Sequence, residues 1–158
     1  VTGQRVDEAV HNTLRLLSQR DSNGETRDAL RRAVEYAQRA PGSSDVVAEL
    51  GGGWIAEEAL AIAVYCALSH PEPDEVLDAL SLAVTHSGDS DSTGAICGNI
   101  VGTAHGAASL PAHLVVQIEG RGTILELADD FVLEQTDRAL LHDESQLDGP
   151  WAQRYPAW

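Results

Sequence analysis

The sequence is poor in basic residues and lacks long apolar runs, and each of these features argues against certain classes of protein. Ten Lys and Arg residues stand against 25 Asp and Glu residues, so the formal net charge is −15 at pH 7. Nucleic acids and anionic membranes both favour basic surfaces, so this balance argues against nonspecific binding to either. The longest nearly unbroken apolar run, residues 59–68, is too short to span a bilayer, and no signal peptide is visible. We therefore expect a cytoplasmic protein with no membrane and no nucleic-acid partner.

Cysteine is also scarce, being limited to Cys66 and Cys97, both in apolar helical contexts. Two thiols so placed predict neither a disulfide framework nor a zinc site, and we expect buried free thiols. The 158 residues, of which 43% are hydrophobic, suffice for a real core. We therefore predict one domain over residues 1–158.

Apolar residues recur at helical spacing through most of the chain, and no segment of any length has the period of a strand. The loop at 40–53 holds three consecutive glycines and leaves room for one helical turn. A short helical segment is expected after Pro111. The pattern predicts longer helices over 5–19, 26–39, 54–69, 74–85, 91–107 and 123–141. The predicted fold class is all-α.

Residues Asp89 to Thr93 place two carboxylates and three hydroxyls in five consecutive positions. Asp89 and Asp91 alternate, so both can point the same way with Ser92 beside them. Such hard oxygen ligands suit magnesium or manganese. The same residues are also ordinary N-caps, because their oxygens accept bonds from the first free N–H groups of the next helix. A calcium loop is excluded, since its twelfth position is Ile100, which has no carboxylate.

Glycine recurs every fourth residue after this cluster, at Gly94, Gly98, Gly102 and Gly106. A helix carries all four on nearly one face, and each costs about 1 kcal/mol relative to alanine. We expect the close approach of a neighbouring helix backbone to offset that loss. Residues 91–107 are therefore predicted to form the buried central helix, with the acidic cluster at its entrance.

Two stretches of the chain, taken together, carry a resemblance to a known family. Residues 88–96 run Gly-Asp-Ser-Asp-Ser-Thr-Gly-Ala-Ile and are followed by the glycine stripe and Leu110-Pro111. Residues 50–63 run Leu-Gly-Gly-Gly-Trp-Ile-Ala-Glu-Glu-Ala-Leu-Ala-Ile-Ala. The first resembles the C-terminal metal motif, and the second the glycine turn and following helix, of the ADP-ribosylglycohydrolase family, which includes relatives of dinitrogenase reductase-activating glycohydrolase. The order and approximate separation are kept, and the resemblance continues to about Phe131.

The resemblance implies a hydrolase that cleaves the glycosidic bond between ADP-ribose and an acceptor, either a protein side chain or a small conjugate. It implies a binuclear site for Mg²⁺ or Mn²⁺, with Asp89, Asp91 and Ser92 as the metal ligands supplied by this chain. Serine stands at position 92 where the family commonly has threonine, and the hydroxyl is kept. The implied partner is ADP-ribose or an ADP-ribosylated substrate.

The resemblance also places the glycine turn against ADP-ribose, which makes Gly52, Gly53 and Trp54 candidate ligand contacts. Glycines let a backbone approach a ligand closely, and an indole offers a flat face to a ring system. The alternatives are a tight turn into the next helix and a tryptophan in the core or at an interface. Glu57 and Glu58 lie in the first turn of that helix, where negative charge is favoured, and neither is predicted to be a general base.

The family's domain is roughly twice as long as this chain, which is long enough for a single core only. Its N-terminal half supplies a glycine–aspartate motif, a catalytic glutamate, and a hydroxyl with two aspartates that completes the metal site. None of these is found before Leu50. The resemblance thus implies the C-terminal half only, with half of the metal site, catalytic residues unknown in this chain, and the chain's own N-terminal fragment as a partner.

Three functions stay open on the sequence alone. The chain is part of an ADP-ribosyl hydrolase, which we favour and which is expected to be inactive alone. Alternatively, it is a noncatalytic helical interaction module that acts through its acidic surface or aromatic tail. In the third hypothesis, it is a regulator that binds ADP-ribose or a metal without cleaving anything.

Three smaller features add expectations. His86, beside the acidic cluster, either helps to position a water or a ligating carboxylate or has a structural role. Asp129 and Asp130 are expected on a solvated face, because neighbouring helix positions diverge by about 100°. The tail from Leu147 holds two tryptophans and Tyr155, and we expect it to dock on the domain or on a neighbouring chain.

Overall fold

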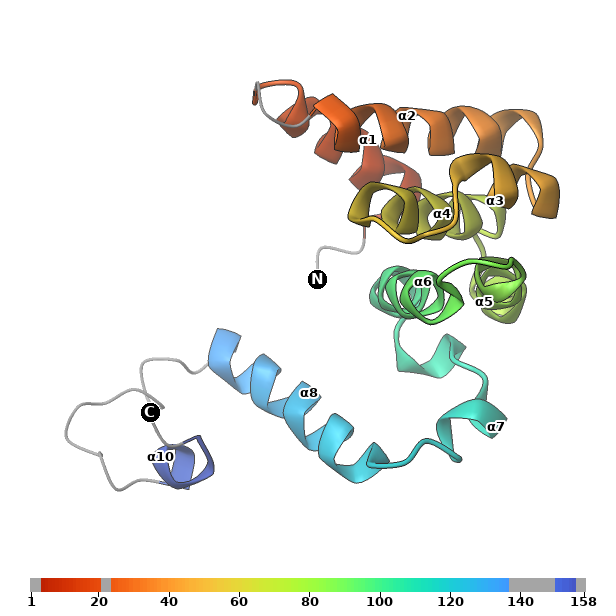
Figure 1. Cartoon of the computed structure of the whole chain (residues 1–158). Coiled ribbons are helices and arrows are strands. Elements are labelled where there is room, and N and C mark those ends of the chain that lie inside the picture. Colours follow the sequence, from red (N-terminus) through yellow and green to blue (C-terminus); the bar gives the residue numbers. More distant parts are fainter. Residues whose placement is uncertain (1–3, 21–23, 137–149, 156–158) are drawn as a thin grey trace. The chain divides into compact units, whose positions relative to one another are not determined.

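The computed structural model of the chain describes residues 4–20, 24–136 and 150–155. These residues fall into two compact units, Val1–Pro111 and Ala112–Trp158 (Figure 1), and each is described by itself. All regular structure in the described residues is helical, which confirms the predicted all-α class. That the two units form one domain stays a prediction. None of the helices in the described ranges is long and apolar enough to cross a membrane.

The first unit is built as three layers of helices (Figure 1). Helices α1 and α2 form one layer, α3 and α4 the middle, and α5 and α6 the other, with α5 and α6 running across the direction of α4. The helix bounds agree with the predicted ranges to within a few residues, and α3 is the helical turn expected in the loop at 40–53. The elements are α1 (Val6–Leu17), α2 (Gly24–Arg39), α3 (Ser44–Leu50), α4 (Ala56–Ser69), the 3-10 helix η1 (Pro73–Glu75), α5 (Val76–Val84), α6 (Ser90–His105) and the 3-10 helix η2 (Ala107–Ser109).

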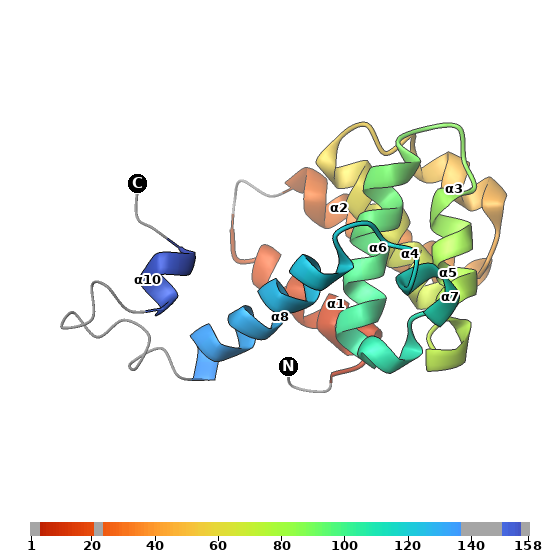
Figure 2. The same cartoon turned by 90° about the horizontal axis from the view of Figure 1, so that it is seen from below.

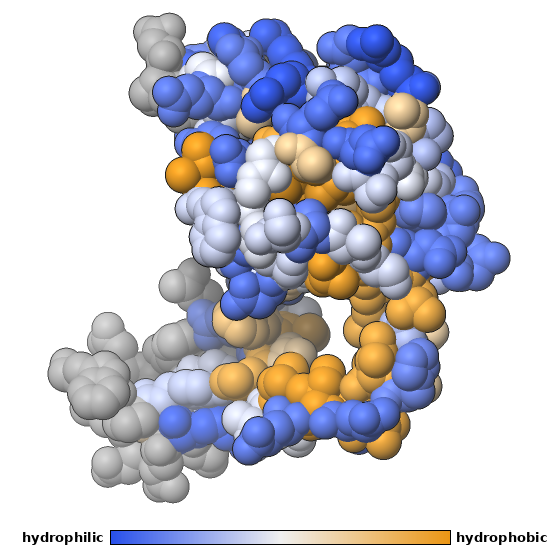
Figure 3. Space-filling view, turned by 45° about the vertical axis from the view of Figure 1, so that its right-hand side comes forward, coloured by the Kyte–Doolittle hydropathy of each residue, from blue (hydrophilic) through white to orange (hydrophobic). Residues whose placement is uncertain are grey.

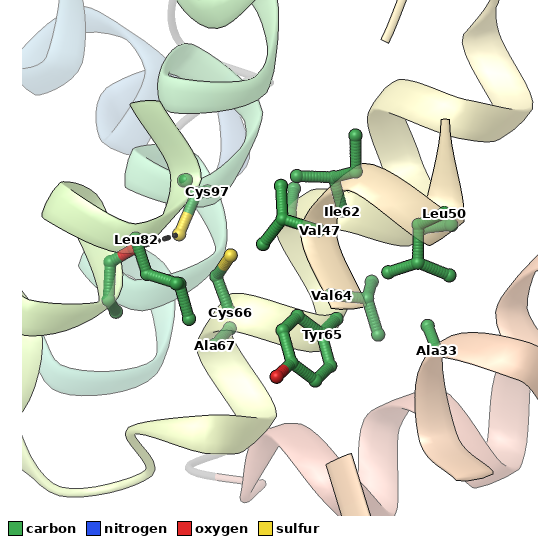
Figure 4. Packing of buried hydrophobic residues seen from close by; sticks show 14 of the residues in the cluster. Ala33, Val47, Leu50, Ile62, Val64, Tyr65, Cys66, Ala67, Leu82 and Cys97 are labelled. Carbon is green, nitrogen blue, oxygen red and sulfur yellow. Dashed lines mark hydrogen bonds between the residues drawn. The ribbon is translucent and has the colours of Figure 1, made fainter. Parts of the chain in front are cut away.

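Helix α4 is the central helix of this unit. Ala59 and residues 61–67 are buried on all its sides, as its nearly continuous apolar sequence predicts. Tyr65 is fully buried among them (Figure 4). Its hydroxyl donates to the carbonyl of Ala40 at 2.6 Å and accepts from the amide of Ser43 at 2.7 Å. The phenol therefore ties the connection between α2 and α3 to the core, because its polar end satisfies two backbone groups there.

Helix α6 differs from its predicted place at the centre. Its buried residues are Thr93, Cys97 and Val101, which lie four apart on one side, and most of its other residues are half-buried or exposed. Ile96 and Ile100 pack against the core from an adjacent face, as expected. One side of α6 therefore belongs to the core, and α4 takes the central position.

The glycine stripe of α6 does not meet a helix backbone in the described residues. Side-chain methyl groups of Val84 and Leu80, both on α5, are the nearest atoms to a Cβ placed at Gly94 and at Gly98. Nothing described lies within 4 Å of such an atom at Gly106, which ends the helix with a φ of 78°. The expected backbone approach is therefore wrong for this part of the chain.

Both cysteines are free and buried, as predicted. They lie on the neighbouring helices α4 and α6 (Figure 4), and the Cys97 thiol is directed at the carbonyl of Ala79 at 3.7 Å. Burial raises the pKa of both thiols, that of Cys97 to about 12, because the thiolate would lose its hydration. The pair is therefore part of the core.

The second unit contains α7 (Ala112–Val115), α8 (Arg121–Thr136) and α10 (Pro150–Arg154). Its surface carries many apolar side chains (Figure 3). Those of α8 that are exposed are Ile124, Leu125, Leu127, Phe131, Val132 and Leu133. This helix therefore has no single apolar face buried within its own unit.

The solvated face expected for the Asp129–Asp130 pair holds only for Asp129. Asp130 is 5% exposed, and the Arg154 guanidinium contacts both of its carboxylate oxygens at 2.7 and 2.8 Å. The Tyr155 hydroxyl donates to it at 2.6 Å, and Tyr155 and Arg154 together lower the pKa of Asp130. The aromatic tail thus docks on α8 as expected, and the prediction failed for Asp130 because its partners lie far along the sequence. Trp158 lies outside the described residues.

Candidate functional site

The two motifs that carry the family resemblance lie in contact. The loop between α3 and α4 and the loop between α5 and α6 meet at one end of the first unit (Figure 2). The backbone N–H of Asp89 donates to the carbonyl oxygen of Gly52 at 2.8 Å. The glycine turn and the acidic cluster, far apart in the sequence, therefore form one structural element.

Glycine is required at this contact for two physical reasons. Gly51 and Gly53 have φ values of 130° and 73°, in the region that side chains disfavour. Gly88 has an ordinary φ, but a Cβ there would lie 1.9 Å from the carbonyl oxygen of Gly52. The turn thus needs glycine for its conformation, and the opposing loop needs it for the close approach of two backbones.

The acidic cluster begins α6, as both of its sequence interpretations require. Asp89 is the N-cap, and its carboxylate accepts from the amide of Ser92 at 3.3 Å. Hydrogen bonding with the Asp91 side chain, and then with Ser92, lowers the pKa of Asp89, so its carboxylate is ionised at neutral pH. Asp91 is exposed in the first turn, and Ser92 is half-buried. The N-cap prediction is confirmed, and the cap leaves the carboxylates at the surface.

The donors present suit part of a site for Mg²⁺ or Mn²⁺. The Asp89 and Asp91 side chains interact directly, so two carboxylates and the hydroxyl of Ser92 lie together. These are the hard oxygen donors that such ions prefer. Within the described residues, however, no group of three or more His, Cys, Asp or Glu side chains is placed to hold a metal ion. The cluster thus fits a metal with fewer protein ligands than a full site has.

Thr93 has a structural role at this site that the sequence reasoning missed. It is fully buried, and its hydroxyl donates to the carbonyl of Ala83 at 2.7 Å. The amide of Gly88 donates to Nδ1 of His86 at 3.1 Å, so the neutral ring carries its hydrogen on Nε2 and donates to Thr93 Oγ1, 2.9 Å away. His86 therefore has the structural role, since it joins the loop to the start of α6. The four-residue spacing of Thr93 from the buried Cys97 was the signal that could have identified it.

The glycine turn contains one exposed aromatic residue, and a carboxylate of helix α4 binds its backbone. Trp54 is 73% exposed, which rules out the alternative of a core tryptophan. Its indole lies against Gly52, where a Cβ would be 2.6 Å from Trp54 Cδ1. The Glu58 carboxylate accepts from the backbone amide of Gly52 at 3.1 Å. Trp54 is therefore exposed to solvent, while Glu58 holds the backbone of the turn at Gly52.

The comparisons with known proteins agree with the two motifs. A family model described as ADP-ribosylglycohydrolase matches residues 1–140, which include both loops and all of the first unit. Comparisons with curated proteins and with solved structures give no match. Since the family model covers nearly the whole sequence, the chain belongs to the ADP-ribosylglycohydrolase family.

Proposed function

We propose that this chain forms part of the site of a metal-dependent hydrolase that cleaves the glycosidic bond between ADP-ribose and an acceptor. The family consists of ADP-ribosyl hydrolases, which typically use Mg²⁺ or Mn²⁺. One observation carries the proposal, the 2.8 Å hydrogen bond between the amide of Asp89 and the carbonyl of Gly52. It supports a single site, because it joins the candidate metal ligands to the candidate nucleotide-contacting turn.

In this proposal Asp89, Asp91 and Ser92 hold the divalent ion. The ion supplies Lewis-acid chemistry when bound, by orienting ribose hydroxyls and polarising the bond to be cleaved. The amide of Ser92 donates to the Asp89 carboxylate at 3.3 Å, and a hydrogen bond to the charged form favours the carboxylate, which is the form that binds cations. A cation also reconciles an anionic pyrophosphate ligand with a chain whose formal net charge is −15.

The glycine turn is the proposed contact for ADP-ribose. Gly52 and Gly53 have no side chains to hold a ligand away from the backbone, and Trp54 exposes an indole on which a ring such as adenine can stack. The ligand would thus meet the turn on one side and the cation on the other.

The remaining metal ligands and the catalytic glutamate are proposed to come from the N-terminal half of the family's domain. Mg²⁺ usually takes six oxygen ligands, some of them waters, and Asp89, Asp91 and Ser92 supply only about three. No further acidic or histidine side chain joins them among the described residues. On this basis we expect weak metal binding and little hydrolysis by residues 1–158 alone.

Isothermal titration with Mn²⁺ and with ADP-ribose tests this proposal, with intact-mass analysis to detect any co-purified fragment. We expect Mn²⁺ binding that Asp91→Asn and Asp89→Asn abolish while the helical circular dichroism is kept. Asp78→Asn is the control, because Asp78 is an exposed aspartate of α5 away from the cluster. If the aspartates only cap α6, Asp89→Asn will leave the Mn²⁺ affinity unchanged and will change stability little, because asparagine caps a helix as well as aspartate does.

The other two functions are distinct outcomes of the same titrations. Binding of ADP-ribose or Mn²⁺ without turnover, even after the N-terminal half of a family member is added, identifies a regulator. No binding under either condition identifies a helical module that has lost the family's chemistry. Binding that appears only with the second fragment and is absent in Asp91→Asn supports a divided hydrolase site.

A further inference from the structure

Two adjacent glutamates begin α4, and only one of them contacts the candidate site. Glu57 and Glu58 both lie in the first turn, where the helix dipole favours negative charge equally. Both side chains are half-buried. The Glu58 side chain accepts from the amide of Gly52 at 3.1 Å, whereas the Glu57 side chain has no hydrogen bond or ion pair within the described part of the chain. The helix dipole alone therefore does not explain why the Glu58 side chain binds the turn and the Glu57 side chain does not.

The backbone of Gly52 joins Glu58 to the acidic cluster. Its N–H donates to the Glu58 carboxylate, and its carbonyl accepts from the amide of Asp89 at 2.8 Å. The fit around Glu58 is tight, because a Cβ at Gly51 would lie 2.4 Å from Glu58 Cδ. A hydrogen bond to an ionised carboxylate is stronger than one between neutral groups. Glu58 thus fixes a turn whose three glycines would otherwise leave it conformationally free.

We infer that Glu58 is a positioning residue for the metal site, which it holds in place through Gly52 and the amide of Asp89. The effect of Glu58 on metal binding rests on the proposed function, in which Asp89 is a metal ligand. Its structural part, the connection from Glu58 to Asp89, stands on the two hydrogen bonds alone. Glu58 has no catalytic part in it, because it contacts the backbone of the turn.

Amide hydrogen exchange of the full chain, followed by NMR, tests the structural part. In Glu58→Ala we expect the Asp89 amide to exchange about tenfold faster or more, because the charge-assisted bond that holds Gly52 is lost. Core amides of α4 such as that of Ala63 report on global unfolding and should change much less. Glu58→Gln keeps an oxygen acceptor at the same reach and should restore most of the Asp89 protection. Glu57→Ala removes the same charge from the same helical turn and should leave Asp89 at the wild-type rate.

Titration of the same variants with Mn²⁺ tests the functional part. Glu58→Ala should weaken Mn²⁺ affinity by about tenfold, Glu58→Gln much less, and Glu57→Ala not at all. Unchanged Asp89 exchange in Glu58→Ala overturns the inference, and so do equal effects of Glu58→Ala and Glu57→Ala. If the Asp89 amide exchanges faster in Glu58→Ala but the Mn²⁺ affinity is unchanged, the inference that Glu58 positions a metal ligand is overturned. If the wild-type chain binds no Mn²⁺, either alone or with the N-terminal half of a family member added, yet Asp89 exchange responds to Glu58, the proposed function fails and the structural connection is supported.

Discussion

The glycines of the two loops that meet at Gly52 and Asp89 and the glycines of helix α6 occupy very different environments, although Gly88 and Gly94 are only a few residues apart. In the loops, Gly51 and Gly53 have positive φ values, and Gly88 faces the carbonyl of Gly52 with no space for a Cβ. In α6, Gly98 has only ordinary van der Waals contact, with a Leu80 methyl at 3.6 Å from a Cβ position. The loops therefore require glycine, and the described surroundings of Gly98 do not.

The difference shows that regular spacing is a weaker indicator of close packing than a cluster of glycines in a turn. A stripe in a helix costs about 1 kcal/mol per residue unless something packs against it. Of the glycines at 94, 98 and 102, only Gly94 has a neighbour closer than 3 Å to a Cβ position, and that neighbour is a side-chain methyl. Substitution by alanine at selected positions measures this comparison directly.

Gly88→Ala should have the largest effect. The added Cβ would meet the Gly52 carbonyl, and because both groups are backbone the two loops must separate. We expect a loss of about 3 kcal/mol in the free energy of unfolding, measured by urea denaturation. Ser87→Ala, an exposed neighbour in the same loop, is the control and should change stability by less than about 0.5 kcal/mol. A Gly88→Ala protein as stable as its control would show that the loops do not meet as described.

Gly98→Ala should have the opposite sign. Alanine gains helix propensity and finds Leu80 at an ordinary contact distance, so we expect stabilisation by about 0.5–1 kcal/mol in the same denaturation assay. Gly102→Ala, whose nearest neighbour is a Leu110 methyl at 3.9 Å, is a matched second variant. Destabilisation by both substitutions would contradict this view of α6 and would restore the expectation that another helix backbone packs on the stripe.

The fold was largely predictable because most helices have a strong apolar periodicity. The ranges predicted for α1, α2 and α4 differ from the observed bounds by only a few residues at either end. The placement of residues 91–107 at the centre was wrong, because glycine spacing does not reveal which residues face the core. Residues 54–69, apolar on nearly all sides, already carried the better signal for burial.

The site was predictable where residue type limits conformation or chemistry, and it was missed where contacts depend on tertiary structure. Consecutive glycines and alternating aspartates marked the two loops, although the sequence alone did not show that they touch. The buried hydroxyl of Thr93 and the carboxylate of Glu58 looked like ordinary residues of a helix start. Their partners, Ala83 and Gly52, belong to preceding loops or helices, and local patterns contain no information on such pairs.

Gly94→Ala should have the smallest net effect and the most informative coupling. A Cβ at this position would lie 2.7 Å from Val84 Cγ1, the end of an exposed side chain that can rotate. Helix propensity favours alanine by about 1 kcal/mol, while moving Val84 off its rotamer costs about 0.5–1.5 kcal/mol, so the two effects nearly cancel. In a Val84→Ala background the obstacle is gone, and Gly94→Ala should then stabilise by about 1 kcal/mol. A double-mutant cycle measured by urea denaturation gives the coupling. Equal effects of Gly94→Ala in both backgrounds would show that Val84 does not restrict this position, and Gly94 would then belong with Gly98.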